Sequence, residues 1–282
     1  MFGENASQYE GYHAPIIGYH RAPLTQKFGA PRQPNLVALI SIIEMLAPYD
    51  DPAAFMGLEA FSHIWISWQF HHNYVNKNNS LNNADSRFRP QVRPPRLGGN
   101  QKIGVFASRS MYRPSALGLS VVKLERIEIV EGRVLLVISG ADMIDATPVI
   151  DIKPYVAYSD AIVHAESGFA PSAPLLSEVT MTESAHEQFM DLVNTEKNEK
   201  LADNATGAEL DTVAAHIHQI HQQLLVSDMD AIQALIAQDP RPAYRRDDIK
   251  TAFVMRYKSV DVTFWLIESK HLQITDVVEV SV

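Results

Sequence analysis

Short apolar stretches separated by turn residues dominate the first 160 positions of the chain. The run GLEAFSHIWISWQFHH (57–72) is rich in Ile, Trp and Phe, a composition that favours a strand. Further strands are predicted at 13–22, 104–110, 117–132, 133–144 and 148–156, whereas LVALISIIEML (36–46) is compatible with a strand or a helix. Many short strands at this spacing predict an all-β barrel or sandwich rather than alternating β and α units.

The succession of short predicted strands ends at about residue 165. Residues 160–182 are a loose connector containing Ser, Ala and Pro, and the polar residues 195–208 are typical of a flexible linker. Between them, Ser184 and Glu187 resemble a capping box before a helix. Helices are predicted at 209–226 and, with Ser227 as N-cap, at 227–238. Three strands follow in TAFVMRYK, VDVTFWLIE and LQITDVVEV, so this region is predicted to be a small α+β domain.

Composition narrows the class of protein. The chain has 282 residues, of which 46% are hydrophobic and 20% charged, as in ordinary globular proteins. It has no apolar run of the roughly 20 residues that span a bilayer, and its first residues lack the features of a signal peptide. Cysteine is absent, which excludes disulfides and thiol catalysis and suits the cytoplasmic location that we predict.

A basic segment stands out against the net charge of −9. Residues 86–124 contain no Asp or Glu, yet they hold Arg87, Arg89, Arg93, Arg96, Lys102, Arg109, Arg113 and Lys123. A solvated loop with scattered arginines is one interpretation. We favour a surface that binds a polyanion, because the guanidinium fork matches phosphate and carboxylate oxygens.

Common catalytic motifs are missing. The sequence contains no GxGxxG, P-loop or GxSxG, so a nucleotide cofactor would bind outside a Rossmann sheet. His71 and His72 are adjacent, and neighbouring residues of a strand point to opposite faces, so we predict no metal site. Asp151 and Lys153 are expected to form an internal ion pair or a dimer contact.

Several segments, in order along nearly the whole chain, carry a family resemblance. They are IIGYHRAP (16–23), KFGAPRQP (27–34), GLEAFSHIWI (57–66), FH (70–71), RPPRLGGN (93–100), GVFASRSMYRP (104–114), GLSVV (118–122), DMIDATPVIDIKPY (142–155) and QDPRPAYR (238–245). The chain resembles the TsaA/YaeB-like family, whose members include the tRNA (adenine-N6)-methyltransferases called TrmO. The resemblance implies a homodimeric, non-Rossmann β-barrel that binds S-adenosylmethionine, followed by a small α+β domain. We therefore expect a mainly β protein with the barrel at 1–170, a connector and linker at 171–208, and the α+β domain at 209–282.

The resemblance also implies which residues form the site. The cofactor pocket is expected to contain Pro31, Arg32, Gln33, His71, His72, Arg109, Leu119, Asp142, Met143, Ile144 and Asp145. Asp142 and Asp145 can direct their side chains to one site only if the chain turns near Ile144, because strand residues three apart face opposite ways. Asp145 is our candidate general base. The residues expected to bind tRNA are Arg93, Arg96, Arg113, Arg241, Tyr244 and Arg245.

The implied reaction is methylation of threonylcarbamoyl-adenosine beside the anticodon of threonine tRNA. The chain departs from the family pattern at Ser115 and Ala116, which replace Asn and Pro, at His72 and Ala146, which replace Gln and Gly, and in the Asn-rich segment 73–86. Two alternatives remain: a noncatalytic tRNA-binding module, which would not bind S-adenosylmethionine, and a metal-dependent hydrolase, which a chelator would inhibit.

Overall fold

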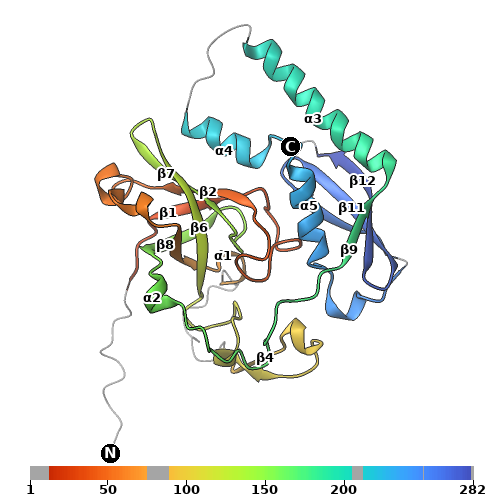
Figure 1. Cartoon of the computed structure of the whole chain (residues 1–282), viewed down its shortest axis with the longest axis horizontal. Helices are drawn as coiled ribbons and strands as arrows, with labels where there is room; N and C mark the ends of the chain where they lie inside the picture. Colours follow the sequence, from red (N-terminus) through yellow and green to blue (C-terminus); the bar gives the residue numbers. More distant parts are fainter. Residues whose placement is uncertain (1–12, 75–88, 205–211, 250, 281–282) are drawn as a thin grey trace, which may run out of the picture.

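Six antiparallel strands close into a barrel in the computed structural model, which describes residues 13–74, 89–204, 212–249 and 251–280 (Figure 1). The strands follow the order β1-β2-β7-β6-β3-β8 around the barrel. Their bounds are β1 Gly18–Arg21, β2 Ile40–Met45, β3 His63–Gln69, β6 Leu117–Val130, β7 Arg133–Ser139 and β8 Thr147–Pro154. The predicted β-barrel is therefore confirmed.

The hydrophobic pattern of each strand follows from what covers its faces. In β3, buried and half-buried residues alternate, so that Ile64, Ile66 and Trp68 point into the barrel core. β7 is different, because all its residues after Arg133 are buried. Its outer face is covered by helix α4 (Val213–His221), whose apolar residues pack on Leu135 and Val137. The continuous apolar run of β7 reflects this burial on both faces, and β2 is likewise buried at every residue after Ile40.

A second sheet lies beside the barrel and has the order β10-β11-β12-β9. Its strands are β9 Glu178–Met181, β10 Phe253–Tyr257, β11 Val260–Glu268 and β12 His271–Glu279. Helices α3 (Glu183–Asn204) and α5 (Asp228–Ala237) pack against this sheet. The expected α+β unit after the barrel is confirmed.

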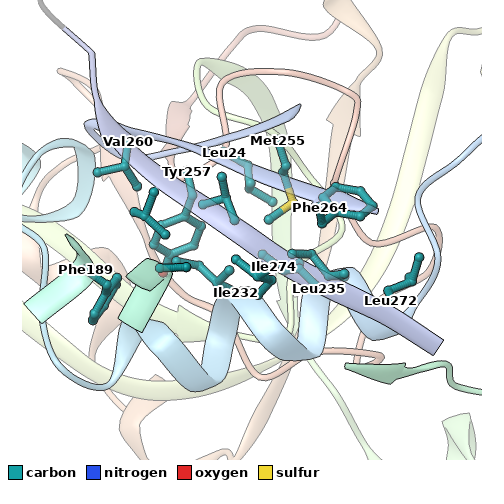
Figure 2. Close-up of a cluster of buried hydrophobic side chains, with 14 of the residues drawn as sticks. Leu24, Phe189, Ile232, Leu235, Met255, Tyr257, Val260, Phe264, Leu272 and Ile274 are labelled. Atoms are coloured by element: carbon teal, nitrogen blue, oxygen red, sulfur yellow. The ribbon is translucent and has the colours of Figure 1, made fainter. Parts of the chain in front are cut away.

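The two units share side chains. Leu24, Val37 and Leu39, which lie between β1 and β2, are buried in the core formed by the second sheet and its helices. Figure 2 shows Leu24 between Met255 and Tyr257 in this core. The segment between β1 and β2 therefore fixes the barrel to the C-terminal sheet.

Shorter elements complete the described chain. A two-stranded ribbon joins β4 (Gln91–Val92) to β5 (Ile103–Gly104), and α1 (His71–Tyr74) and α2 (Ala157–Asp160) are single turns. Short 3-10 helices occur at Pro52–Phe55, Leu58–Ala60, Pro95–Leu97, Val105–Ala107 and Ala243–Arg245. None of the helices in the described ranges is long and apolar enough to cross a membrane.

Three local predictions need correction. The strand expected at 104–110 is instead a 3-10 turn after β5, because the backbone bonds locally, with Ser108 N donating to Val105 O, and strand pairing ends at Gly104. The expected connector and linker at 171–208 contains β9, which pairs in parallel with β12, and the helix predicted there continues as α3 through residues 195–204 of the expected linker. This helix is capped by Thr182, whose Oγ1 accepts a hydrogen bond from Ala185 N, rather than by Ser184. Residues 1–12, most of the Asn-rich segment and Arg87 lie outside the described residues.

Candidate cofactor and tRNA site

The loop between β7 and β8 carries both candidate carboxylates. It is anchored at its start by Asn35, whose N–H donates to Gly140 O at 2.8 Å, and near its end by Asp145, whose N–H donates to Leu24 O at 2.8 Å. The chain turns at Asp145 and Ala146, where Ala146 has a φ of 57°. The residues between the carboxylates, Met143 and Ile144, are buried. The turn that the sequence required near Ile144 is present.

Asp142 is held by a chain of hydrogen bonds from two barrel strands. Trp68 Nε1 on β3 donates to Ser120 Oγ on β6 at 2.9 Å, and Ser120 Oγ donates to Asp142 Oδ1 at 2.5 Å. Burial raises the pKa of Asp142, and the Ser120 hydrogen bond and the charge of Arg109 only partly oppose this effect. Arg109 in turn donates to Gln33 Oε1 at 2.6 Å. Three residues predicted from separate segments thus form one group.

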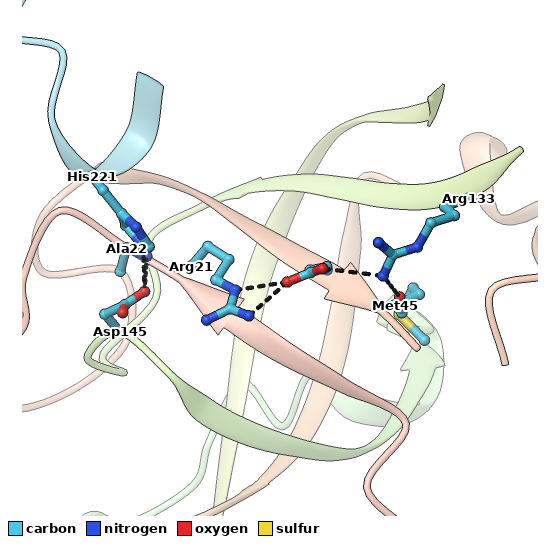
Figure 3. A network of polar contacts seen from close by, with 7 residues as sticks. Arg21, Ala22, Met45, Arg133, Asp145 and His221 are labelled. Carbon is cyan, nitrogen blue, oxygen red and sulfur yellow. Dashed lines mark hydrogen bonds and ion pairs between the residues drawn. The ribbon is translucent and has the colours of Figure 1, made fainter. Parts of the chain in front are cut away.

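Asp145 has a different environment. Its Oδ1 accepts hydrogen bonds from Ala22 N at 3.1 Å and from His221 Nε2 at 2.6 Å (Figure 3). Burial alone would raise the pKa of Asp145, but the hydrogen bond and charge of His221, with Ala22 and Arg21, outweigh burial and lower it. Asp145 is therefore an ionised carboxylate at neutral pH.

His71 lies near this carboxylate. Burial lowers the pKa of His71, as does the neighbouring His72, while a backbone contact with Gln69 and the charge of Asp145 oppose the shift. The ring centroids of His71 and His72 are 4.3 Å apart, so the two imidazoles lie together rather than on opposite faces of a strand. His71 Nε2 is buried and has no hydrogen-bond partner within the described chain, so it is available to a ligand. No three His, Asp or Glu side chains in the described ranges converge as a metal site requires.

Two predicted pocket residues lie apart from this group. Leu119 is 55% exposed, because its neighbour Ser120 points inward and successive strand residues face opposite ways. It lines a shallow surface pocket with Trp65, Lys153 and Asp160. Arg32 points toward the C-terminal unit, where its Nη2 donates to Asp239 O and Arg241 O, each at 3.3 Å. Pro31, beside Arg32, is buried.

Several arginines of the basic segment are exposed in the described part of the chain. Arg93 and Arg96 are exposed in the connection between β4 and β5, and Arg96 donates to Ser172 O. Arg113 is half-buried, donates to Ser108 O at 3.0 Å and lies over the Phe106 ring. The turn containing Ser115 and Ala116 is closed by a hydrogen bond from Ala116 N to Arg113 O.

The predicted tRNA-binding residues of the C-terminal unit separate into two groups. Tyr244 and Arg245 are exposed. Arg241 is buried, with its Nε and Nη2 donating to the carboxylate of Asp239 at 2.8 and 3.2 Å, so this guanidinium is not on the surface that tRNA could reach. Arg241 therefore has a structural role, which its position within the QDPRPAYR segment did not reveal.

The expected pairing of Asp151 with Lys153 is not present. Both side chains are exposed on β8, and no ion pair joins them in the described structure.

Two histidines near the site, His20 and His221, were not predicted from the sequence, although both lie against the Asp142–Asp145 loop. No local pattern marks His221, since its partner Asp145 lies 76 positions earlier in the chain.

Comparisons with known proteins show which family the chain is similar to. The family model of the tRNA-methyltransferase O N-terminal domain matches residues 19–161, and that of the TrmO C-terminal domain matches residues 208–280. The chain is 36% identical to the tRNA (adenine(37)-N6)-methyltransferase of Escherichia coli, over 82% of this chain and 83% of that protein. It is 38% identical to a Pseudomonas aeruginosa protein provisionally named S-adenosylmethionine-dependent methyltransferase RcsF, over 87% of this chain and 89% of that protein.

Solved structures show the same similarity. A crystal structure of TrmO from Pseudomonas aeruginosa superposes with a TM-score of 0.67 and 28% sequence identity. The match covers 95% of this chain and 99% of that chain, so it includes both the barrel and the C-terminal unit.

Proposed function

Because the chain belongs to the tRNA-methyltransferase O family, we propose that it transfers a methyl group from S-adenosylmethionine to N6 of an adenine in tRNA. The observation that supports this function best is the loop carrying Asp142 and Asp145. Residues from separate segments of the family pattern, including Gln33, His71 and Arg109, gather around it.

The chemistry of this group fits S-adenosylmethionine. The cofactor supplies an electrophilic methyl group on a sulfonium, and its adenosine and methionine parts offer hydroxyl and ammonium donors. The Asp145 carboxylate and the orphaned Nε2 of His71 can accept such donors, and Arg109 is suited to the cofactor carboxylate. We propose that the pocket comprises Pro31, Gln33, His71, His72, Arg109 and residues 142–145, and that it does not include the Arg32 guanidinium, which donates to the C-terminal unit. The resemblance also implies a homodimer, in which the exposed Leu119 is available to a second copy.

The two carboxylates are suited to different tasks. The acceptor nitrogen of threonylcarbamoyl-adenosine is urea-like, so it needs a base or a group that stabilises the developing anion. The sequence favours Asp145 as the base. The environments favour Asp142, because a raised pKa makes a carboxylate a better proton acceptor and a lowered pKa makes it a worse one. We propose that Asp142 takes the proton and that Asp145 binds a ligand group as a fixed anion.

The exposed arginines support the substrate that we propose, a threonylcarbamoylated threonine tRNA. Exposed guanidinium groups such as Arg93 and Arg96 suit the phosphates of the anticodon loop of threonine tRNA. A threonylcarbamoyl group adds a carboxylate that an arginine can grip with two hydrogen bonds, which plain adenine lacks. This grip would give affinity and orientation together.

Methyl incorporation into purified threonine tRNA tests the proposal. The tRNA is prepared from a normal strain and from one that cannot make the threonylcarbamoyl group. We expect incorporation into the first alone, since arginines without their carboxylate partner would disfavour the unmodified base. Addition of a chelator should leave the rate unchanged.

The other outcomes identify the alternatives. Equal incorporation into both tRNAs would mean a general adenine methyltransferase. Incorporation into neither, together with no binding of S-adenosylmethionine by calorimetry, would mean a noncatalytic tRNA-binding module. Loss of activity with a chelator would favour metal-dependent chemistry.

A further inference from the structure

The last turn of helix α4 contacts the proposed methyl-transfer site. His221, the final residue of α4, reaches the β7–β8 loop, and its Nε2 lies 2.6 Å from Asp145 Oδ1 (Figure 3). Both side chains are mostly buried, with 23% and 16% of their surfaces exposed. Through this contact, helix α4, which follows the barrel in the sequence, reaches Asp145, which lies in one of the segments that resemble the family.

Helix α4 is held firmly enough to place His221. At its start, Thr212 Oγ1 accepts from Ala215 N at 3.1 Å, and Glu131 of the β6–β7 turn accepts from Val213 N at 3.2 Å. Its apolar face, which includes Ile217 and Ile220, packs on the outer face of β2 and β7. The position of His221 is therefore set by the packing of a whole helix.

The contact leaves one oxygen of Asp145 for a ligand. His221 and Ala22 N both bind Oδ1, and no donor from the described residues binds Oδ2. A carboxylate with one oxygen held by two donors cannot rotate freely, so the direction of Oδ2 is fixed. The other titratable groups that act on Asp145 or His71 are Arg21 and His20 on β1, Lys27, and His72 beside His71.

We infer that His221 is a positioning residue, which holds Asp145 so that Oδ2 accepts an N–H or O–H donor of S-adenosylmethionine. The inference rests on the proposed function and extends it, because it makes a helix outside the barrel part of the cofactor site. Its electrostatic consequence is that Asp145 stays ionised in a setting where burial would favour its neutral form.

Calorimetric binding of S-adenosylmethionine to the full chain tests the role of His221. His221→Ala removes the donor, and we expect affinity at pH 7.5 to fall about 10-fold, near the lower end of what a hydrogen bond to a charged group contributes. His221→Gln restores a donor at a similar distance and should recover most of the affinity. His218→Ala is the matched control, because His218 lies on the same turn, is exposed, and should bind the cofactor like the wild type.

A second measurement distinguishes a positioning role of His221 from a contribution to folding stability alone. In His221→Ala, the acid limb of the binding profile should move to higher pH, because Asp145 loses the partner that keeps it ionised, and ¹³C NMR of the Asp145 carboxyl should show the same shift. Unchanged affinity and titration in His221→Ala would overturn the inference while leaving the proposed function intact. So would equal losses in the Ala and Gln variants with lowered melting temperatures. A wild-type protein that binds no cofactor would overturn the proposed function itself, and this inference with it.

Discussion

At the scale of single residues, the least expected feature is the buried imidazole of His20. It lies on β1, is fully buried, and its Nδ1 donates to Ile144 O at 3.1 Å, since a carbonyl oxygen can only accept. Its Nε2 has no partner among the described residues. Burial lowers the pKa of His20 to about 4, although the Ile144 contact and the charge of Asp145 oppose the shift. His20 is therefore neutral in the folded protein and supports the loop between Asp142 and Asp145.

This burial predicts an acid-dependent loss of stability. Between the ordinary histidine value of 6.5 and about 4, the unfolded chain binds a proton at His20 that the folded chain does not. The free energy of unfolding should thus fall as the pH drops through this window, by up to about 3 kcal/mol from this residue. Asp145, whose pKa is lowered from 3.8, loses its contribution only at more acidic pH.

Urea unfolding from pH 7 to 4.5 measures the effect. His20→Asn keeps a donor near the position of Nδ1 but cannot titrate, so its unfolding free energy should decline less steeply than that of the wild type. Parallel curves for the two proteins would show that His20 is not the group responsible.

At the scale of secondary-structure elements, the pairing of β3 with β6 supports Asp142. Trp68 lies opposite Gly118, and a Cβ added to Gly118 would lie 2.2 Å from Trp68 Cε2. The indole can reach Ser120 only because this position has no side chain, and Ser120 in turn donates to Asp142. Gly118 is therefore needed for the hydrogen bonds from Trp68 to Ser120 and from Ser120 to Asp142.

Gly118→Ala should displace the Trp68 ring. We expect unfolding free energy to fall by about 1–3 kcal/mol, as for overpacked cores, and affinity for S-adenosylmethionine to fall with it. Gly104→Ala is the control, because a Cβ there meets nothing within 4 Å and its φ is −60°. Denaturant melts and calorimetry of both variants would measure the two effects. A Gly118→Ala protein that resembles the Gly104 control would contradict this account of Trp68.

The elements differ in how well the sequence predicts them. β3 was predictable because its alternating residues face the core and the surface in turn. LVALISIIEML was ambiguous because α4 buries the outer face that would otherwise have been polar. The family segments predicted Gln33, Arg109 and Asp142 together, and the structure joins them. His221 was not predictable, since no local pattern marks a contact between residues 76 positions apart.

At the scale of the whole molecule, the barrel and the C-terminal sheet are joined by buried residues and backbone hydrogen bonds of one segment. Leu24 is fully buried in the second core although it follows β1, and Lys258 N donates to Pro23 O at 2.8 Å. On the other side of the same segment, Leu24 O accepts from Asp145 N. Loss of packing in the C-terminal core should therefore reach the proposed site.

Leu24→Ala is predicted to lower the unfolding free energy by about 2–5 kcal/mol, because it leaves a cavity in a close-packed core. Both units should unfold in one transition. Tryptophan fluorescence reports this, since Trp65 and Trp68 lie in the barrel and Trp265 lies in the second sheet, so a Trp265→Phe background follows the barrel alone. Leu175→Ala, at a position that is 79% exposed, is the control. An unshifted transition of Leu24→Ala in the Trp265→Phe background would mean that the units unfold independently.

The placement of Leu24 also has a consequence for synthesis on the ribosome. Its buried neighbours include Met255, Phe264 and Ile274, so a segment made early acquires its partners only after about 250 further residues have been translated. At about 5–20 residues per second, that interval is on the order of 10–50 s. The segment between β1 and β2 therefore cannot reach its final packing until the C-terminal sheet has been synthesised. The same holds for the loop around Asp145, which this segment anchors. The proposed site is completed only after translation has passed through the C-terminal strands.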